Sequence, residues 1–109
     1  MTYQTEFPDF PAADMPALPD GCGFVDTSWH NDACPSFTSD EIGLTIWVDF
    51  LDPALCEYQD AQGNRQYPRF AVHCQDHGVE TSGPAIQTDD WAEVLAFIES
   101  HRGSRHEPG

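Results

Sequence analysis

The sequence predicts an α+β fold, in which a small antiparallel sheet of three to five strands packs against one C-terminal helix. Two observations predict it. Apolar and polar residues alternate over residues 42–50 and 69–74, which is typical of strands with one buried face. Apolar residues then recur every three to four positions over residues 88–103, which is typical of an amphipathic helix. With 109 residues, the chain is long enough for one domain with a single modest core.

The composition divides the chain into three segments. Residues 1–21 form an extended, acidic, proline-rich arm, residues 22–103 form the single α+β domain, and residues 104–109 form a flexible tail. The prolines of FPDFPAADMPALPDG remove backbone donors and fix φ, which opposes a helix in the arm. Because apolar residues alternate with acids there, we expect the arm to dock on a surface, either of this domain or of a partner. These apolar residues are Phe7, Phe10, Met15 and Leu18.

Each alternating segment has an apolar face and a polar face. The apolar face carries Leu44, Ile46, Val48 and Phe50 in IGLTIWVDF, and Phe70, Val72 and Cys74 in RFAVHC. We expect this face to meet the apolar stripe of the helix. The opposite face is expected to be exposed to solvent or covered by the arm. Its members include Trp47, Asp49, Arg69 and His73.

Shorter elements connect these segments. Leu55–Tyr58 is a candidate partner for a later strand across a turn at Gly63-Asn64. Residues 78–83 predict a second turn, and Ala85–Gln87 predict a short strand.

The C-terminal helix has recognisable ends. Thr88 is its expected N-cap, and Asp89 and Asp90 follow in the first turn, where the helix dipole favours anions. Gly103 is placed to stop the helix. Its apolar stripe consists of Trp91, Val94, Leu95 and Ile98.

Charge is the most unusual property of the composition. There are 19 acids against 4 arginines, there is no lysine, and the formal net charge is −15. Residues 1–64 contain twelve of the acids and no base. Such a field repels nucleic acid and anionic membranes, and it attracts basic surfaces over a long range. The same charge also suits plain solubility, or a housekeeping domain adapted to a salty cytoplasm.

Several observations bear on the cellular location. No stretch approaches the roughly 20 apolar residues of a membrane helix. The segment MTYQTEFPDF lacks the basic and apolar regions of a secretory signal. We therefore expect a cytoplasmic protein without membrane contact, whose four cysteines are reduced thiols.

The sequence does not predict an enzyme. Cys34 with His30, or Cys74 with His77, would form a thiolate–imidazole pair, but a reactive thiolate needs positive surroundings and Cys34 lies in the base-free half. There is no glycine-rich phosphate loop and no nucleophile elbow. We expect no catalytic residue and no cofactor.

A small zinc-binding structural domain is the alternative function. Its ligands would be His30, Cys34, Cys74 and His77, which supply enough nitrogen and sulfur for a tetrahedral site. Their spacing matches no known zinc finger or ribbon.

The leading hypothesis is a non-enzymatic, acidic interaction protein that binds a basic protein surface. The four arginines do not form a basic stripe on one face, which excludes ordinary binding to DNA or RNA. Acids spaced like phosphates would instead be attracted to the basic channel of a nucleic-acid-binding protein, which is therefore the expected partner. Tryptophan is enriched at interface hot spots, so exposed tryptophans would anchor the contact. The expected contact residues are Asp26, Trp29, Asp32, Asp40, Glu41, Trp47, Asp49 and Asp52.

In size, acidity and lack of catalytic motifs, the chain resembles the small proteins that phages encode to disarm host defence, including anti-CRISPR proteins and other DNA mimics. The resemblance rests on the base-free stretch Met1–Asn64 and on the compact strand and helix pattern that follows. It implies inhibition by binding, in which the protein covers the nucleic-acid channel of a complex such as a CRISPR effector. No functional residue is transferred by this resemblance.

Overall fold

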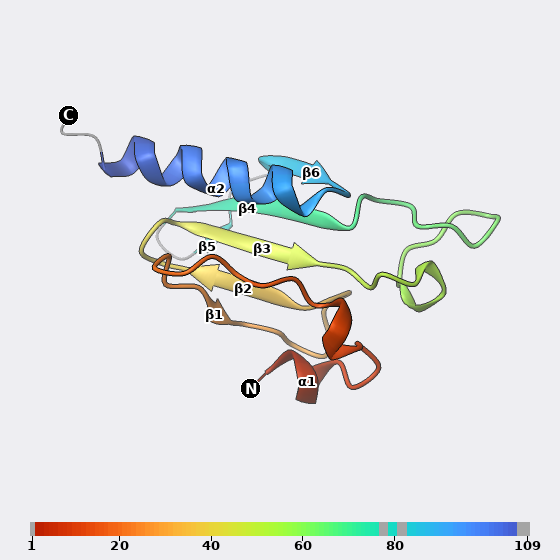
Figure 1. The fold of residues 1–109 in the computed structure, drawn as a ribbon. Coiled ribbons are helices and arrows are strands. Elements are labelled where there is room, and N and C mark those ends of the chain that lie inside the picture. The colour runs from red at the N-terminus through yellow and green to blue at the C-terminus, as the bar shows by residue number, and fades with distance from the viewer. Residues whose placement is uncertain (1, 77–78, 81–82, 107–109) are drawn as a thin grey trace.

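The computed structural model describes residues 2–76, 79–80 and 83–106 (Figure 1). Its elements, in chain order, are α1 (Tyr3–Glu6), η1 (Ala12–Asp14), β1 (Val25–Asp26), β2 (Ser36–Ser39), β3 (Leu44–Val48), η2 (Pro53–Leu55), β4 (Phe70–Asp76), β5 (Val79–Glu80), β6 (Ile86–Thr88) and α2 (Trp91–His106), where η marks a 3-10 helix.

The strands form one open antiparallel sheet. Its linear order is β1-β2-β3-β4-β5, and β6 pairs with β4 beside this path. The strand β5 pairs with the last two residues of β4, whereas β6 pairs with its first three. Together with α2, this sheet confirms the predicted α+β class.

The core lies on the apolar face of the central strands. Ile46 is paired with Phe37 on one side and with Val72 on the other. Ile46 and Val72 are fully buried, as are Leu44 and Val48 at the two ends of β3. The alternation that predicted these two strands therefore also identified their buried face correctly.

Two separate covers close this face. The helix α2 lies over β4 and β6 (Figure 1) and buries Val94 and Ile98, while Trp91 packs 5.1 Å from the ring of Phe70. The N-terminal segment runs along β2 and β1 on the same side (Figure 1) and buries Phe7 and Phe10.

The N-terminal segment docks on its own domain. The ring of Phe10 lies 5.0 Å from that of Phe50 and 5.7 Å from that of Tyr3, and Met15 and Leu18 pack against the same core. Two short helical turns, α1 and η1, were not expected from the prolines. They fit because Pro8 follows α1 and Pro11 precedes η1, so that neither proline lies inside a helix.

The helix α2 differs from the expectation at both ends. Asp90, not Thr88, is its N-cap, because Asp90 Oδ1 accepts a hydrogen bond from the Ala92 N–H at 3.0 Å. Thr88 Oγ1 instead accepts from the Asp90 N–H at 3.0 Å, just before the helix begins. The helix continues past Gly103 to His106. The predicted stop is wrong because one glycine costs a helix only about 1 kcal/mol.

The shorter connections also differ in detail. The predicted strand Ala85–Gln87 is observed one residue later, as β6. The predicted pairing of Leu55–Tyr58 is reduced to a Gln59↔Arg65 bridge and a Gln66 N–H to Tyr58 carbonyl bond of 3.1 Å. Leu55 belongs to η2 instead. The predicted turn over 78–83 lies mostly outside the described residues.

Residues 51–68 form a loop that protrudes beyond the sheet (green in Figure 1). Asp52 Oδ1 caps η2 at its start by accepting from the Ala54 N–H at 3.0 Å. Gly63, with φ at 81°, turns the chain at its tip, where glycine alone avoids strain. Within the described parts of the chain, no helix has both the length and the apolar character needed to cross a bilayer.

Replacing Phe10 with alanine tests the docking of the N-terminal segment. We expect the free energy of unfolding to fall by about 3 kcal/mol, because a buried phenylalanine loses its transfer energy and leaves a cavity. Chemical denaturation of the whole chain measures it. The neighbouring Asp9→Asn, at an exposed position, should change it by less than about 0.5 kcal/mol. Equal stability of the two variants would show that the segment does not pack on the sheet.

Candidate functional site

The face of the sheet opposite α2 is covered by neither α2 nor the N-terminal segment, and polar side chains stabilise one half of it. Thr27 Oγ1 is hydrogen-bonded to Ser36 Oγ at 2.9 Å and to Thr38 Oγ1 at 3.0 Å. Thr38 Oγ1 lies 3.1 Å from Thr45 Oγ1, and the Gln75 amide donates to Thr45. This row of paired hydroxyl and amide groups crosses β2, β3 and β4, and such cross-strand pairs stabilise a sheet.

The other half of this open face carries a hollow of about 270 Å³. Its floor is a row across three strands, because Trp47 pairs with Ala71 and Ala71 pairs with Gln87. His73, two residues along β4 from Ala71, also lines the hollow. The prediction that Trp47 and His73 lie opposite the core is therefore correct.

The loop 51–68 supplies the aromatic wall of the hollow. Tyr58 and Tyr67 both line it, with ring centroids 5.8 Å apart in an edge-to-face arrangement. The Gln59↔Arg65 bridge closes the loop just inside these tyrosines. Both tyrosines are half exposed, at 51% and 49%. Three aromatic residues, two from the loop and Trp47 from β3, thus surround one space that opens to solvent.

The polar side of the hollow is negatively charged. Asp49 lines it and keeps its orientation by accepting from the Phe50 N–H at 2.8 Å. Cys34, which is buried, lies on the same lining. Burial raises the pKa of the Cys34 thiol well above its ordinary value, and the charges of Asp49 and then Asp32 raise it further. This thiol therefore stays protonated at neutral pH and is no nucleophile.

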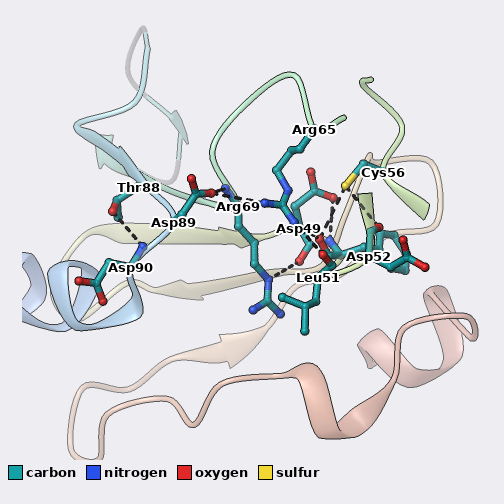
Figure 2. A network of polar contacts seen from close by, with 10 residues as sticks. Asp49, Leu51, Asp52, Cys56, Arg65, Arg69, Thr88, Asp89 and Asp90 are labelled. Carbon is teal, nitrogen blue, oxygen red and sulfur yellow. Dashed lines mark hydrogen bonds and ion pairs between the residues drawn. The ribbon is translucent and has the colours of Figure 1, made fainter. Parts of the chain in front are cut away.

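Figure 2 shows how two arginines hold the base of the loop. Arg65 donates to the carbonyls of Phe50 and Leu51, at 3.0 and 2.9 Å, and lies 3.4 Å from Asp89 Oδ1. The same carboxylate accepts the N–H of Arg69 at 2.8 Å. Asp89 therefore joins the C-terminal arm of the loop to the start of α2, and Arg65 connects that arm to the residues where the loop begins.

The charge of Arg69 points away from the hollow. Its Nε donates to the Asp49 carbonyl at 3.0 Å, and its guanidinium lies 4.9 Å from the ring of Phe70, on the core side of β4. The guanidinium also donates to the Asp14 carbonyl, in the direction of the N-terminal segment (Figure 2). Arg69 is nevertheless one of the residues that line the hollow.

The structure divides the eight predicted contact residues between two ends of the sheet. Ser36 pairs with Trp47, so the loop that precedes β2 lies at the end where β3 stops. This end carries Trp29, Asp32, Trp47, Asp49 and Asp52, and we call it the loop end, together with residues 51–68.

Three predicted contact residues lie elsewhere or have structural partners. Asp40 and Glu41 occupy the β2–β3 turn, at the opposite end of β3. The Glu41 side chain lies over Gly23, where an added Cβ would come within 2.7 Å of its Oε2. Asp26 accepts hydrogen bonds from the N–H groups of Tyr3 and Ser28, at 2.7 and 3.0 Å. Asp26 therefore anchors the N-terminal segment.

The four residues of the zinc alternative are not brought together. Cys74 is paired with Leu44, where β3 begins. Cys34 lies at the other end, because the carbonyl of the next residue, Pro35, accepts from the Val48 N–H at 3.0 Å. Zinc ligands lie only about 2.0–2.3 Å from the ion, so the two sulfurs cannot share one.

The two histidines of the zinc alternative, His30 and His77, do not complete a metal site among the described residues. His30 Nδ1 lies 2.9 Å from Glu6 Oε1, and this hydrogen bond lowers the pKa of Glu6. His77 lies outside the described residues. No group of three or more histidine, cysteine or acidic residues within 2–76, 79–80 and 83–106 could hold a metal ion. Cys34 and Cys74 therefore do not share a zinc ion in this structure, and His77 is not among the residues that it describes.

Sequence reasoning missed Tyr58 and Tyr67. It treated the segment between the strands as a polar connection, because adjacent positions are glutamine, asparagine and acids. A usable signal was present, since the two tyrosines flank the Gly63 turn almost symmetrically in YQDAQGNRQY. Paired aromatics on the two arms of a turn meet across it, as these do.

Compared with protein-family models, curated proteins and solved structures, the chain matches none. The function must therefore be argued from the geometry and charge of its own residues.

Alkylation with iodoacetamide at pH 8 tests the state of Cys34. Because its pKa is raised, its thiolate fraction is lower than that of an ordinary cysteine, so we expect modification at least about tenfold slower than in the denatured chain. Peptide mass spectrometry follows each cysteine separately. Modification of native Cys34 faster than in the denatured chain would indicate a reactive thiolate and would contradict the buried, protonated state.

Proposed function

We propose that this protein is a non-enzymatic, acidic binding protein that docks on a basic protein surface. The partner is a nucleic-acid-binding protein, and the acids stand where phosphates would otherwise lie. In its most specific form, the protein is an inhibitor of the anti-CRISPR type that covers the nucleic-acid channel of an effector complex. Such a partner implies a cytoplasmic protein.

The sign of the exposed charge supports this proposal. Among the residues whose side chains are described, eleven acids are exposed and neither Arg65 nor Arg69 is. The exposed acids are Asp9, Asp20, Asp40, Glu41, Asp52, Glu57, Asp60, Asp89, Asp90, Glu93 and Glu99. The two arginines are half-buried and are bonded to carbonyl groups and to Asp89. A basic surface approaching the described residues therefore meets almost uniform negative charge, which accelerates association.

Exposed apolar side chains at the loop end support a partner contact there. Of the six large apolar side chains that are exposed among the described residues, four belong to the protruding loop: Leu51, Leu55, Tyr58 and Tyr67. Trp29 lies at the same end and is 40% exposed. Acids surround them, namely Asp49, Asp52, Glu57 and Asp60. Apolar and aromatic anchors within a charged rim are the usual anatomy of a protein–protein interface.

The proposed contact set therefore keeps part of the predicted one and adds to it. Trp29, Asp32, Trp47, Asp49 and Asp52 remain, because all five lie at the loop end. The four exposed residues of the loop join them. Asp26, Asp40 and Glu41 contribute only to the long-range field.

The salt dependence of binding tests the proposal. The immobilised protein is used to capture a partner from host lysate, and the purified pair is then measured by calorimetry. We expect the affinity to fall at least about tenfold between roughly 0.05 and 0.3 M NaCl, because screening weakens an interaction between opposite charges. A competing DNA duplex should displace the protein if it occupies a nucleic-acid channel. A complex that is insensitive to salt would contradict the proposal.

Matched charge variants locate the contact. Asp52→Asn with Glu57→Gln removes two charges at the loop end, and asparagine retains the ability to cap η2. Asp40→Asn with Glu41→Gln removes two charges at the opposite end. We expect the first pair to slow association about threefold to tenfold and the second pair to have less than about twofold effect. If both pairs slowed association equally, the contact would lie elsewhere, or association would depend only on the overall negative charge.

A further inference from the structure

The hollow on the open face has a size and a lining that restrict what it can hold. Its volume of about 270 Å³ is just below the roughly 300 Å³ at which pockets for drug-sized ligands begin. It suits one side chain better than a larger molecule. Aromatic residues form much of its surface, from β3 and from the protruding loop.

The chemistry of the lining selects a planar cation. Trp47, Tyr58 and Tyr67 present aromatic rings, whose faces attract cations within about 6 Å. Asp49 adds a carboxylate to the lining. Arg69 also lines the hollow and interacts electrostatically with Asp49, while its guanidinium is held by the carbonyls of Asp49 and Asp14 and by the ring of Phe70.

We propose that this hollow receives an arginine side chain of the basic partner, with the guanidinium stacked between Trp47 and the two tyrosines and paired with Asp49. Arginine fits better than lysine because its planar group stacks on aromatic rings and matches a carboxylate bidentately. This inference rests on the proposed function, since it assigns one group of the basic surface to one pocket.

The position of the hollow agrees with this role. It lies at the loop end, beside the exposed apolar residues proposed as anchors. The positive charge of an inserted arginine would also be attracted by the acids around the hollow. Its ion pair with Asp49 would be stronger than an ion pair on the open surface, because the pocket is less exposed to water. The hollow would thus contribute to the specificity of binding, while the overall negative charge would increase the association rate.

The test uses small probes and needs no partner. N-acetyl-arginine amide is titrated into the labelled whole protein and followed by amide and indole NMR signals, beside N-acetyl-citrulline amide, which has the same shape without the charge. We expect the arginine probe to shift the Trp47 indole and the amides of Ala71 and Gln87. The citrulline probe should bind at least about tenfold more weakly.

Variants with matched controls complete the test. Asp49→Asn keeps an oxygen for the Phe50 N–H and should weaken the arginine probe about tenfold, whereas Asp40→Asn should leave it unchanged. Tyr58→Ala, at a half-exposed loop position, should weaken it about threefold, and Val25→Ala, at an exposed position on β1 outside the contact set, should not. The amide spectra of each variant also report whether the fold is intact.

Two results would overturn the inference. One is equal binding of the citrulline probe, which would make the hollow an ordinary apolar site. The other is an arginine response spread over the acidic surface and reduced equally by Asp40→Asn. Either failure leaves salt-dependent association with a partner intact. Conversely, a salt-insensitive complex would remove the proposed function without removing the shifts caused by free arginine amide.

Discussion

Burial of the β3–β4 pair on one face is the interaction on which the rest of the structure depends. Ile46 and Val72 face each other at its centre, and burying each side chain is worth about 1.5–3 kcal/mol. Both covers, α2 and the N-terminal segment, contribute on this face because α2 packs chiefly against β4 and β6, whereas Phe7 and Phe10 of the N-terminal segment are also buried in the core. Among the described residues, neither of these covers lies on the opposite face of the same strands, where the loop 51–68 forms one wall of the hollow.

The chain has only four arginines and no lysine, so its exposed surface is strongly negative. Two of these arginines, Arg65 and Arg69, hold the base of the loop 51–68. Arg65 and Arg69 each donate to backbone carbonyls just after β3, and Asp89 ties both to the start of α2. Charge-assisted bonds of this kind are stronger than neutral ones. Both arginines are half-buried, so their guanidinium groups are less accessible to a partner than the exposed acids are. A protein with a net charge of −15 thus exposes its acids while its described arginines face inward.

Local pattern was sufficient for the sheet and helix, and insufficient for the site. Strict alternation in IGLTIWVDF and RFAVHC identified two strands and their buried face. Side chains of a strand alternate between its two faces, so a shift of the register by one residue would move Ile46 and Val72 to the exposed face. The N-cap was misplaced by two residues because Thr88 and Asp90 both suit a cap, and only the backbone decides between them. The separation of Asp40 from Asp49 depends on strand register, which no local pattern shows. Tyr58 and Tyr67 were missed because the segment that contains them was interpreted as a polar connection. The turn at Gly63 brings the two side chains together at the hollow.

We propose that the protein binds its partner through the loop end and not through its acidic surface at large. Hydrogen–deuterium exchange of the complex against the free protein tests this most directly, because it reads every segment of the whole chain at once. The account predicts added protection over residues 47–68 and in the segment before β2, with the β2–β3 turn and α2 unchanged. Protection confined to α2 or to Asp40 and Glu41, with residues 47–68 unaffected, would contradict it.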